Sequence, residues 1–444
     1  MGARERGRLI RGLGPAAATA LVAGNVIGSG IYVVPGSLAE IAGPVGLVAW
    51  LVNALGYLCL TATFADLGGA YAISGGPQAF AGRAFGPFAC LEVGYLYWTC
   101  VITANAAFAT GFVGYLAVFY PEVAGPVPAL LVGQALLWGF CALNVIGVRA
   151  GGVVQVLTTV LKIAPLLLVA VALLGRASAA NLAPFAPHGY GALLPAIALV
   201  SWLFLGSESI TVPAEEVVGS GRTIRRAAYA GFGIACAVYF LVAAALTLGL
   251  PATALAGSVS PLAAAARAVL GPWGETLVTL GALVSIAGVL NGWTLVGGRL
   301  PYAAARDGVA PAALGRVHAR FATPAVALVV TTLLSAGLLL LTLHRTLLEA
   351  YNFIALLSTA TALVAIGGAC AAELVLLRRE PARFTAAQRR RGPVTATAGL
   401  LVVALMLAGT GAWVCALTAL AMLVPIPYYL FLRARRGAPA GAPL

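Results

Sequence analysis

The sequence predicts an all-α polytopic membrane protein, and two features of it carry that prediction. Of the 444 residues, 61% are hydrophobic and only 9% are charged, whereas a soluble domain carries about 25% charged residues. The apolar residues also form runs close to the ~20 residues that cross a bilayer as a helix. These runs lack the alternation of apolar and polar residues that is typical of membrane β-barrels.

Twelve apolar runs are the candidate membrane spans. In chain order they cover residues 14–36, 45–66, 86–119, 127–147, 151–175, 192–217, 227–250, 273–298, 323–343, 347–377, 394–412 and 414–432. If the N-terminus lies inside, 22 arginines fall in inside segments and 3 fall outside, at Arg176, Arg267 and Arg345. Because basic residues are retained on the cytoplasmic side, we expect a multi-pass protein of the cytoplasmic membrane with both termini in the cytoplasm.

The first and the sixth span each contain a short segment that weakens a helix. The sequence GSG interrupts the first at 28–30, and GSE interrupts the sixth at 206–208. Glycine destabilises helices, and paired breaks are typical of transporters built from inverted repeats. The predicted organisation is a tail at 1–13, a first repeat at 14–175, a second at 176–377, two further spans at 394–432 and a tail at 433–444. The alternative is that glycine, with 54 copies, is simply frequent in membrane helices.

Two ionisable side chains lie deep within the predicted spans. Lys162 lies in the fifth span, and Glu208 follows the break in the sixth. A charge in a bilayer is costly, so such a residue faces a cavity or a partner. Glu208 could hold a cationic ligand group or carry a proton, and the alternative is a structural hydrogen bond to the broken backbone. Backbone N–H groups at Ser29 and Gly30 begin a half-helix, whose positive end can hold a carboxylate.

Aromatic and amide side chains near the middle of the spans extend the candidate site. Trp202, Trp293, Tyr97 and Asn105 are of this kind. Membrane tryptophans prefer the interfaces, so a tryptophan at the midplane indicates a role such as stacking on an ammonium or guanidinium group. For both tryptophans packing alone is the alternative, and Asn105 could equally bond a neighbouring helix. Together with the half-helix and Glu208, these residues fit an amino acid or a diamine.

The motifs indicate neither an enzyme nor a cofactor or metal site. The seven cysteines lie in apolar spans without a CxxC motif or a Cys/His cluster, so no metal or disulfide framework is expected. The glycines at 24–30 are not followed by Lys-Ser/Thr and lie inside a span, which argues against a phosphate-binding loop. The net charge of +13 is distributed between the spans, so no nucleic-acid partner is expected.

Six segments carry a family resemblance over nearly the whole chain. They are GNVIGSGIYVVPG at 24–36, YLYWTCVITAN at 95–105, SWLFLGSES at 201–209, SPLAAAARAVLG at 260–271, NGWTLVGG at 291–298 and AAARDGVAP at 303–311. In these the chain resembles the amino acid–polyamine–organocation superfamily of transporters, within it the arginine/agmatine and putrescine/ornithine antiporter group. The resemblance implies twelve transmembrane helices in a five-plus-five inverted repeat, broken helices 1 and 6, and alternating access.

The resemblance also implies roles for individual residues along the substrate path. Asn25, Ser29 and Gly30 would meet the region of the substrate α-carboxylate. Tyr97 would line the path that the substrate takes.

A second group of implied residues concerns the substrate side chain and gating. Trp293 would be the stacking platform, Trp202 part of the outward gate and Leu205 an aliphatic contact. Asn105 and Glu208 would affect substrate binding and release.

Three features of the sequence depart from the antiporter group. The loop before the third span is shortened to GGPQAFAG at 75–82, and LLSTATALVAIGG at 356–368 lacks a tyrosine expected near a lower gate. Lys162 stands where arginine/agmatine members have a small apolar residue, whereas proton-coupled and neutral amino acid members carry lysine. The favoured function is exchange of a cationic amino acid or polyamine, and the alternative is a proton-coupled permease for neutral amino acids. Proton coupling and a homodimer are open expectations.

Lys162 is the one lysine in the chain, since every other basic residue is arginine. Lysine can lose its proton when it is desolvated, whereas arginine cannot. The resemblance places the fifth span beside the unwound part of the first. An ammonium group there could donate hydrogen bonds to carbonyl groups of the first span in place of a coupling ion, and its deprotonation would link transport to pH. The alternative is a structural ammonium that never titrates.

Overall fold

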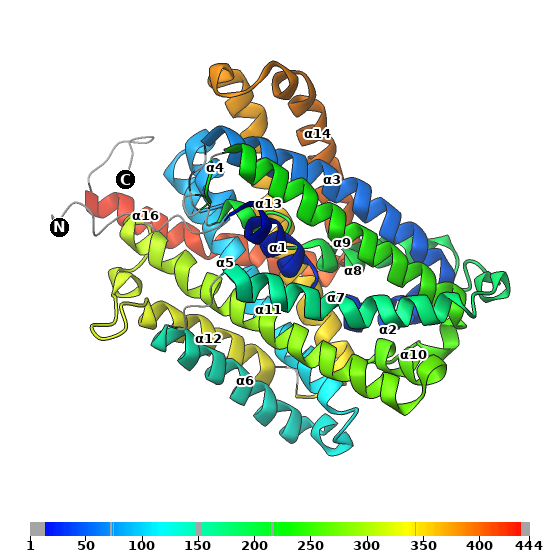
Figure 1. Ribbon diagram of the computed structural model, residues 1–444. Coiled ribbons are helices and arrows are strands. Elements are labelled where there is room, and N and C mark those ends of the chain that lie inside the picture. Colours follow the sequence, from blue (N-terminus) through cyan, green and yellow to red (C-terminus); the bar gives the residue numbers. More distant parts are fainter. Residues whose placement is uncertain are drawn as a thin grey trace.

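The computed structural model describes residues 14–71, 73, 75–147, 152–212, 214, 217–219, 221–341 and 343–436, without the side chains of 152–158, 160, 435 and 436. The predicted tail at 1–13 and most of the one at 433–444 lie outside these residues. The elements are helices gathered into one bundle (Figure 1).

Each predicted span contains α-helix within its described part. The α-helices are α1 (Pro15–Val26), α2 (Gly30–Ile41), α3 (Gly46–Tyr71), α4 (Pro77–Phe85), α5 (Pro87–Leu116), α6 (Pro126–Ile146), α7 (Gly152–Leu174), α8 (Leu193–Phe204), α9 (Gly221–Gly249), α10 (Pro261–Leu270), α11 (Pro272–Arg306), α12 (Ala325–Leu340), α13 (Leu347–Arg379), α14 (Ala386–Gly409), α15 (Ala412–Leu423) and α16 (Pro425–Arg436). Short 3-10 turns join several of them, including η5 (Ser209–Thr211).

Ten helical stretches in the described part are long and apolar enough to cross a membrane. They are Pro15–Ile41, Gly43–Tyr71, Pro87–Leu116, Pro126–Ile146, Tyr190–Thr211, Gly221–Gly249, Pro272–Arg306, Leu347–Arg379, Ala386–Gly409 and Ala412–Ala434. The fifth and ninth predicted spans correspond to shorter apolar helices, Leu161–Leu174 and Ala325–Leu340. The chain is therefore a multi-pass membrane protein.

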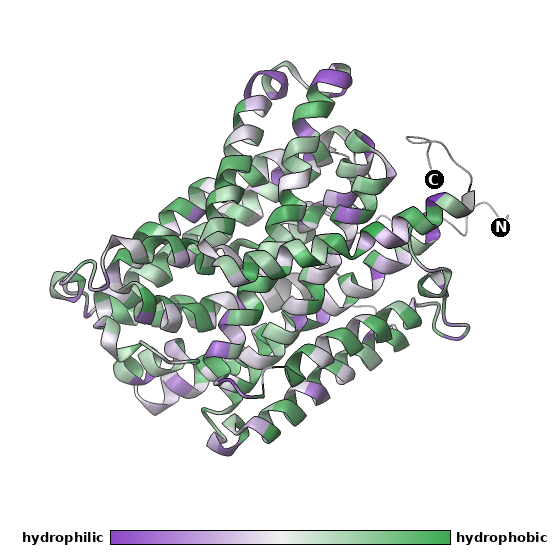
Figure 2. Cartoon of the chain, turned by 180° about the vertical axis from the view of Figure 1, so that it is seen from behind, coloured by the Kyte–Doolittle hydropathy of each residue, from purple (hydrophilic) through white to green (hydrophobic). Residues whose placement is uncertain are grey.

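The outer surface of the bundle is apolar, as lipid requires. Figure 2 shows hydrophobic residues along the lengths of the helices and hydrophilic ones gathered mainly near their ends. Leu131 on α6, Leu333 on α12 and Leu401 on α14 are 63%, 58% and 68% exposed. Exposed apolar surface of this extent marks contact with a membrane or a partner. The two helices α6 and α12 pack on each other at one edge of the bundle (Figure 1).

Both helices that were predicted to be broken are interrupted where expected. The first span divides into α1 and α2 around residues 27–29, and α8 ends at Phe204, before η5. Gly206 has φ +108°, a conformation that residues with a side chain rarely adopt. A Cβ atom on Gly206 would also lie 2.9 Å from the Asn25 carbonyl oxygen. The two breaks therefore touch each other, and the contact depends on glycine.

One tyrosine lies within hydrogen-bond distance of a carbonyl group at each of the two breaks. A helix end leaves its last carbonyls without intrahelical partners. The Tyr239 hydroxyl of α9 lies 2.6 Å from the Val26 oxygen and 2.9 Å from the Leu203 oxygen, and can donate to either. The Tyr57 hydroxyl of α3 donates to the Ser201 oxygen at 3.0 Å. These side chains replace the water that a broken helix would otherwise need.

A short helix corrects the prediction of a loop before the third span. The segment read as a shortened loop at 75–82 overlaps α4 (Pro77–Phe85). Proline at the first helical position favours helix initiation, because its missing N–H is not needed there. Gly86 ends the helix with φ +90°. The run of Gly and Pro therefore starts and stops a helix rather than forming an open loop.

Ion pairs gather at one end of the bundle, which we name the arginine-rich end. It contains the end of α13 at Arg379 and the starts of α9 and α14, with Arg225 and Arg391. The Arg379 guanidinium donates to the Ala84 oxygen of α4 at 2.9 Å. Asp66 at the end of α3 accepts from Arg391 at 2.8 Å and lies 3.8 Å from Arg225. These bonds fix the ends of five helices relative to one another.

The Tyr239 hydroxyl yields a stability prediction. Tyr239→Phe leaves two buried carbonyl groups without their side-chain donor, and we expect a loss of about 1–3 kcal/mol in the free energy of unfolding. A lower thermal midpoint of the purified protein in detergent would show this loss. Tyr190→Phe is the matched control, because Tyr190 is 69% exposed. Equal midpoints for the two variants would contradict the role given to Tyr239.

Candidate functional site

A small cavity lies where the two helix breaks meet α5 and α11. We call it the central cavity, and its lining residues are Asn25, Val26, Gly28, Ser29, Gly30, Phe108, Trp202, Leu203, Leu205 and Trp293. Six residues of the predicted site are therefore brought together: Asn25, Ser29, Gly30, Trp202, Leu205 and Trp293. They come from segments that lie up to 268 positions apart in the chain, from Asn25 to Trp293.

The first wall of the central cavity is the start of the half-helix α2. Ser29 is the residue before α2, and Gly30 is its first residue. A Cβ atom on Gly30 would lie 2.7 Å from Cγ of Leu203. The absence of a side chain at Gly30 therefore lets α2 and α8 approach closely. Backbone N–H groups at this helix start are suited to an anionic group such as a carboxylate.

A further part of the wall is aromatic, and a phenylalanine joins the two predicted tryptophans. The Phe108 ring centroid lies 5.5 Å from that of Trp202 and 6.0 Å from that of Trp293. The arrangement suits edge and face contacts between rings. Phe108 was not among the predicted site residues. Its position three residues after Asn105, close to one helical turn, was the signal that could have indicated it.

A tyrosine of α13 binds two residues of the cavity wall. Its hydroxyl, on Tyr351, accepts a hydrogen bond from Trp202 Nε1 at 2.8 Å and shares one with Ser29 Oγ at 2.9 Å. About two turns along α2, Ser37 Oγ donates to Asn352 Oδ1 at 2.9 Å. We call the Tyr351 contacts the latch. Nothing in the local sequence around Tyr351 distinguishes it from a packing residue, so only the fold reveals it.

The remaining predicted residues lie behind the cavity rather than on its wall. Glu208 is fully buried, and its carboxylate accepts from the Tyr97 hydroxyl at 2.8 Å and from the Gly206 N–H at 3.1–3.2 Å. In this conformation Glu208 therefore binds the broken backbone of its own segment. Asn105 is 1% exposed, and its side-chain oxygen has no hydrogen-bond partner among the described residues.

Lys162 contacts the first break from the side of α7. Its Nζ donates to the Gly24 oxygen at 3.1 Å, two residues before the end of α1. The Tyr32 hydroxyl of α2 donates to the Lys162 backbone oxygen at 2.9 Å. Lys162 is only 3% exposed. One lysine thus connects α7 to both halves of the broken first span, through its ammonium and its own carbonyl.

The central cavity is too small for any amino acid in this conformation. Its volume is about 10 Å³, roughly the space that one water molecule needs. The rings of Phe108, Trp202 and Trp293 fill the remainder. A ligand can therefore bind there only after these rings and the latch separate, so the structure is a closed conformation.

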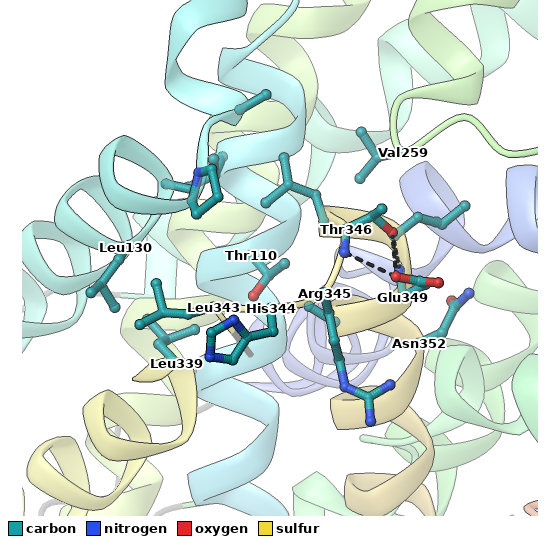
Figure 3. A pocket seen from close by; sticks show the side chains of 18 of the residues that line it. Thr110, Leu130, Val259, Leu339, Leu343, His344, Arg345, Thr346, Glu349 and Asn352 are labelled. Carbon is teal, nitrogen blue, oxygen red and sulfur yellow. Dashed lines mark hydrogen bonds between the residues drawn. The ribbon is translucent and has the colours of Figure 1, made fainter. Parts of the chain in front are cut away.

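A second and much larger cavity lies at the end of the bundle opposite the arginine-rich end. It has a volume of about 930 Å³ and opens between α5, α6, α12 and the first turns of α13. Figure 3 shows Thr110, Leu130, Arg345, Glu349 and Asn352 around it. Since Asn352 follows Tyr351, adjacent residues of α13 face the large cavity and the latch. The start of α13 therefore separates the two spaces.

Comparison with known proteins adds relatives over the same region. A family model described as amino acid permease matches residues 13–432. The cadaverine/lysine antiporter of Escherichia coli (strain K12) is 31% identical over 338 residues, which are 74% of this chain and 75% of that protein. The arginine/agmatine antiporter of Chlamydia caviae is 28% identical over 352 residues, 74% of this chain and 71% of that protein. The arginine/agmatine antiporter of Chlamydia felis is 27% identical over 358 residues, which are 76% of this chain and 72% of that protein.

The latch yields a prediction about access to the central cavity. A single cysteine at Leu205→Cys, in a background without the seven native cysteines, reports whether the cavity is open to a water-soluble maleimide. Tyr351→Phe removes two hydrogen bonds, worth roughly 1–3 kcal/mol together. We therefore expect labelling to accelerate by about fivefold to a hundredfold.

The control for this test is Tyr120→Phe, because Tyr120 is 55% exposed and distant from the latch in sequence. It should leave the labelling rate unchanged. An unchanged rate in Tyr351→Phe as well would mean that the tyrosine hydroxyl does not hold the cavity closed.

Proposed function

We propose that this chain, which belongs to the amino acid permease family, exchanges a cationic amino acid for an amine by alternating access. The relatives with antiporter names support exchange of amino acids and amines. The observation that carries the finer proposal is the central cavity, whose lining combines a half-helix start, both broken helices and two tryptophans. Such midplane sites between broken helices are typical of secondary transporters.

The substrate's two ends would find different chemistry in the opened cavity. Its carboxylate would bind backbone N–H groups at Ser29 and Gly30, where the positive end of α2 lies. Its cationic side chain would stack on Trp293, with Trp202 and Phe108 completing the aromatic wall. Asn25 and Leu205 would contact the remaining surface. The same wall accepts a diamine, which lacks the carboxylate.

Glu208 would supply the negative charge that selects a cationic substrate. In the closed conformation its carboxylate is bound to Tyr97 and to the Gly206 N–H. Gly206 lies next to the cavity wall, because Leu205 adjoins it. When the latch opens, we expect Glu208 to exchange one of these bonds for the substrate cation. Asn105, with its unpartnered oxygen, would accept a further hydrogen bond from the same group.

Alternating access would follow from opening each side of the central cavity in turn. The latch between Tyr351, Ser29 and Trp202 closes the side that faces the large cavity. We infer that the large cavity, with about 930 Å³, is the vestibule through which substrate arrives when the latch is released. Trp202 belongs both to the latch and to the wall, so a substrate that displaces it also changes the gate.

We infer twelve transmembrane helices, ten of them arranged as two inverted repeats at 14–175 and 176–377. The paired breaks support this, since Gly206 follows Gly28 by 178 positions. A second pair also supports it. The short helix α4 ends at Gly86 with φ +90° and α5 begins at Pro87, while α10 ends at Gly271 with φ +75° and α11 begins at Pro272. Each half thus repeats the same short helix, glycine cap and proline start.

We infer that the arginine-rich end faces the cytoplasm, which places both termini inside. The reason is the distribution of arginine between the connections, because basic residues are retained on the cytoplasmic side. The large cavity then opens to the exterior. If a cysteine at Ala386→Cys reacts with an impermeant maleimide in intact cells, the arginine-rich end faces the exterior and the inferred orientation is wrong.

The alternative of a proton-coupled permease for neutral amino acids has less support. Lys162 is the feature that favours it, as a residue type of proton-coupled relatives. The relatives found by comparison are named for lysine, cadaverine, arginine and agmatine, all of them cationic substrates. Buried Glu208 and the three aromatic rings suit such substrates better than a neutral side chain.

Counterflow uptake in proteoliposomes tests the proposed substrate class. Vesicles loaded with arginine, agmatine, ornithine, putrescine, lysine or alanine should take up labelled cationic substrate only when a cationic compound is inside. Trp293→Leu should weaken binding roughly threefold to thirtyfold, because a cation–π contact is worth about 0.5–2 kcal/mol. Glu208→Gln should weaken cationic substrates selectively. Unchanged preference for arginine over alanine in both variants would refute the cationic site.

Lys162 yields a prediction about coupling. If its ammonium takes the place of a coupling ion beside Gly24, transport is independent of sodium. If it also titrates, Lys162→Arg flattens the pH dependence of transport, because arginine keeps its proton, and Lys162→Ala removes most activity. Sodium-stimulated uptake by the native protein, or an unaltered pH profile in Lys162→Arg, would show that this lysine is not the switch.

A further inference from the structure

A buried carboxyl group lies outside the central cavity, near the arginine-rich end. Glu373 lies on α13, six residues before its end at Arg379, and its side chain is fully buried. Among the described residues neither of its carboxyl oxygens makes a hydrogen bond of good geometry, and the Thr63 hydroxyl of α3 is the side-chain donor within reach. Removing an ionised carboxylate from water without a partner costs many kcal/mol, and such groups become neutral instead. The geometry therefore requires an explanation for Glu373 that packing alone does not give.

The surroundings of Glu373 do not compensate a negative charge. The charged groups whose fields reach it are Asp66 of α3 and Arg391 of α14, and the thiol of Cys370 lies on its own helix. Arg391 is already bonded to Asp66 at 2.8 Å, and Arg225 of α9 lies 3.8 Å from the same carboxylate. Asp66 thus takes the nearby positive charges. A second carboxylate beside it would be repelled as well as desolvated.

Glycine on the neighbouring helix allows α14 to cover this carboxyl closely. A Cβ atom on Gly392 would lie 3.2 Å from Glu373 Oε1 and 2.7 Å from Cδ1 of Leu377. The preceding residue, Arg391, has 42% of its side chain exposed. Glu373 therefore lies against α14 beside the partly exposed Arg391. A small displacement of α14 would expose the Glu373 carboxyl to water.

Glu373 shares its helix with the latch. Tyr351 lies 22 positions earlier on α13, about 33 Å along the axis. Since α13 also packs on α5, α4 and α14, a tilt that releases Tyr351 at one end would alter the contact with α14 at the other. The Glu373 carboxyl is stable in the closed packing only when it is neutral. Its protonation would therefore oppose this tilt, and its ionisation would favour it.

We propose that Glu373 is a proton-binding site, separate from the central cavity, whose protonated form stabilises the closed conformation. On opening, the carboxyl O–H bond breaks and the proton passes to water at the arginine-rich end, which leaves a carboxylate exposed to water or to Arg391. On closing, the carboxylate takes up one proton. The proposal rests on the closed and open conformations of the proposed function, and it needs no substrate.

Cysteine labelling at different pH values tests the proposal without transport. The Leu205→Cys reporter is labelled between about pH 8 and about pH 6, and each rate is divided by that of the same protein unfolded in detergent, which corrects for thiol ionisation. We expect labelling to slow as pH falls, by at most about tenfold per pH unit for one proton. In the Glu373→Gln variant the reporter cysteine should be labelled slowly at every pH, because the neutral amide mimics the protonated acid. Glu373→Asp should keep a pH dependence.

The matched control is Glu380→Gln, seven residues further along the chain. Glu380 accepts hydrogen bonds from Arg83 at 2.8 and 3.0 Å. This bonding holds the pKa of the Glu380 carboxyl below its ordinary range, so it stays ionised throughout the experiment. The same chemical change should therefore leave the pH dependence intact. If Glu373→Gln keeps the slope of its parent, or the parent shows no slope, the proposal is wrong.

Infrared difference spectra provide a second readout that does not depend on gating. The parent protein at neutral pH should show a protonated-carboxyl band that Glu373→Gln lacks. Absence of that difference would also overturn the proposal. If these two experiments succeed while counterflow fails, the proton site stands and the proposed substrate exchange falls.

Discussion

Two interrupted helices in an apolar interior leave backbone groups that water cannot reach, and the rest of the structure depends on how these groups are satisfied. The end of α1 gives its Gly24 carbonyl to Lys162 and its Val26 carbonyl to Tyr239. The break after α8 gives the Gly206 N–H to Glu208. An unsatisfied group of this kind costs roughly 1–3 kcal/mol, so each of these side chains stabilises a break that a glycine alone would only permit.

The same constraint explains why polar residues near the central cavity are bound in the closed conformation. Glu208 is held by Tyr97 and the backbone, and the Tyr351 hydroxyl contacts both Ser29 and Trp202. A ligand must therefore offer replacements for these bonds as well as displace the rings. A carboxylate and a cation on one molecule supply a partner for each sign of charge. An apolar compound of equal size would leave the released groups unpaired.

Helix α13 connects the two ends of the bundle because it is long, continuous and packed on several neighbours. Near its start it carries Tyr351 in the latch, and toward the arginine-rich end it carries Glu373 under α14. A rigid helix transmits a tilt over its whole length, whereas broken helices absorb it. In the proposed mechanism the broken helices would form the binding place, and the unbroken α13 beside them would act as the lever.

The sequence alone indicated the membrane class and the two broken spans, because hydrophobic length and glycine are local signals. Of the six residues that line the cavity, Ser29, Gly30, Trp202 and Trp293 carried local signals, whereas Asn25 and Leu205 were indicated only by the family resemblance. The sequence also indicated Lys162, since one lysine among arginines is visible without a fold. Only the tertiary structure decided that Glu208 faces its own backbone in the closed conformation, that Phe108 joins the wall and that Tyr351 closes it. The physical reason is distance in the chain: Tyr351 meets Ser29 across 322 positions, and no local pattern specifies which side chains helix packing brings together.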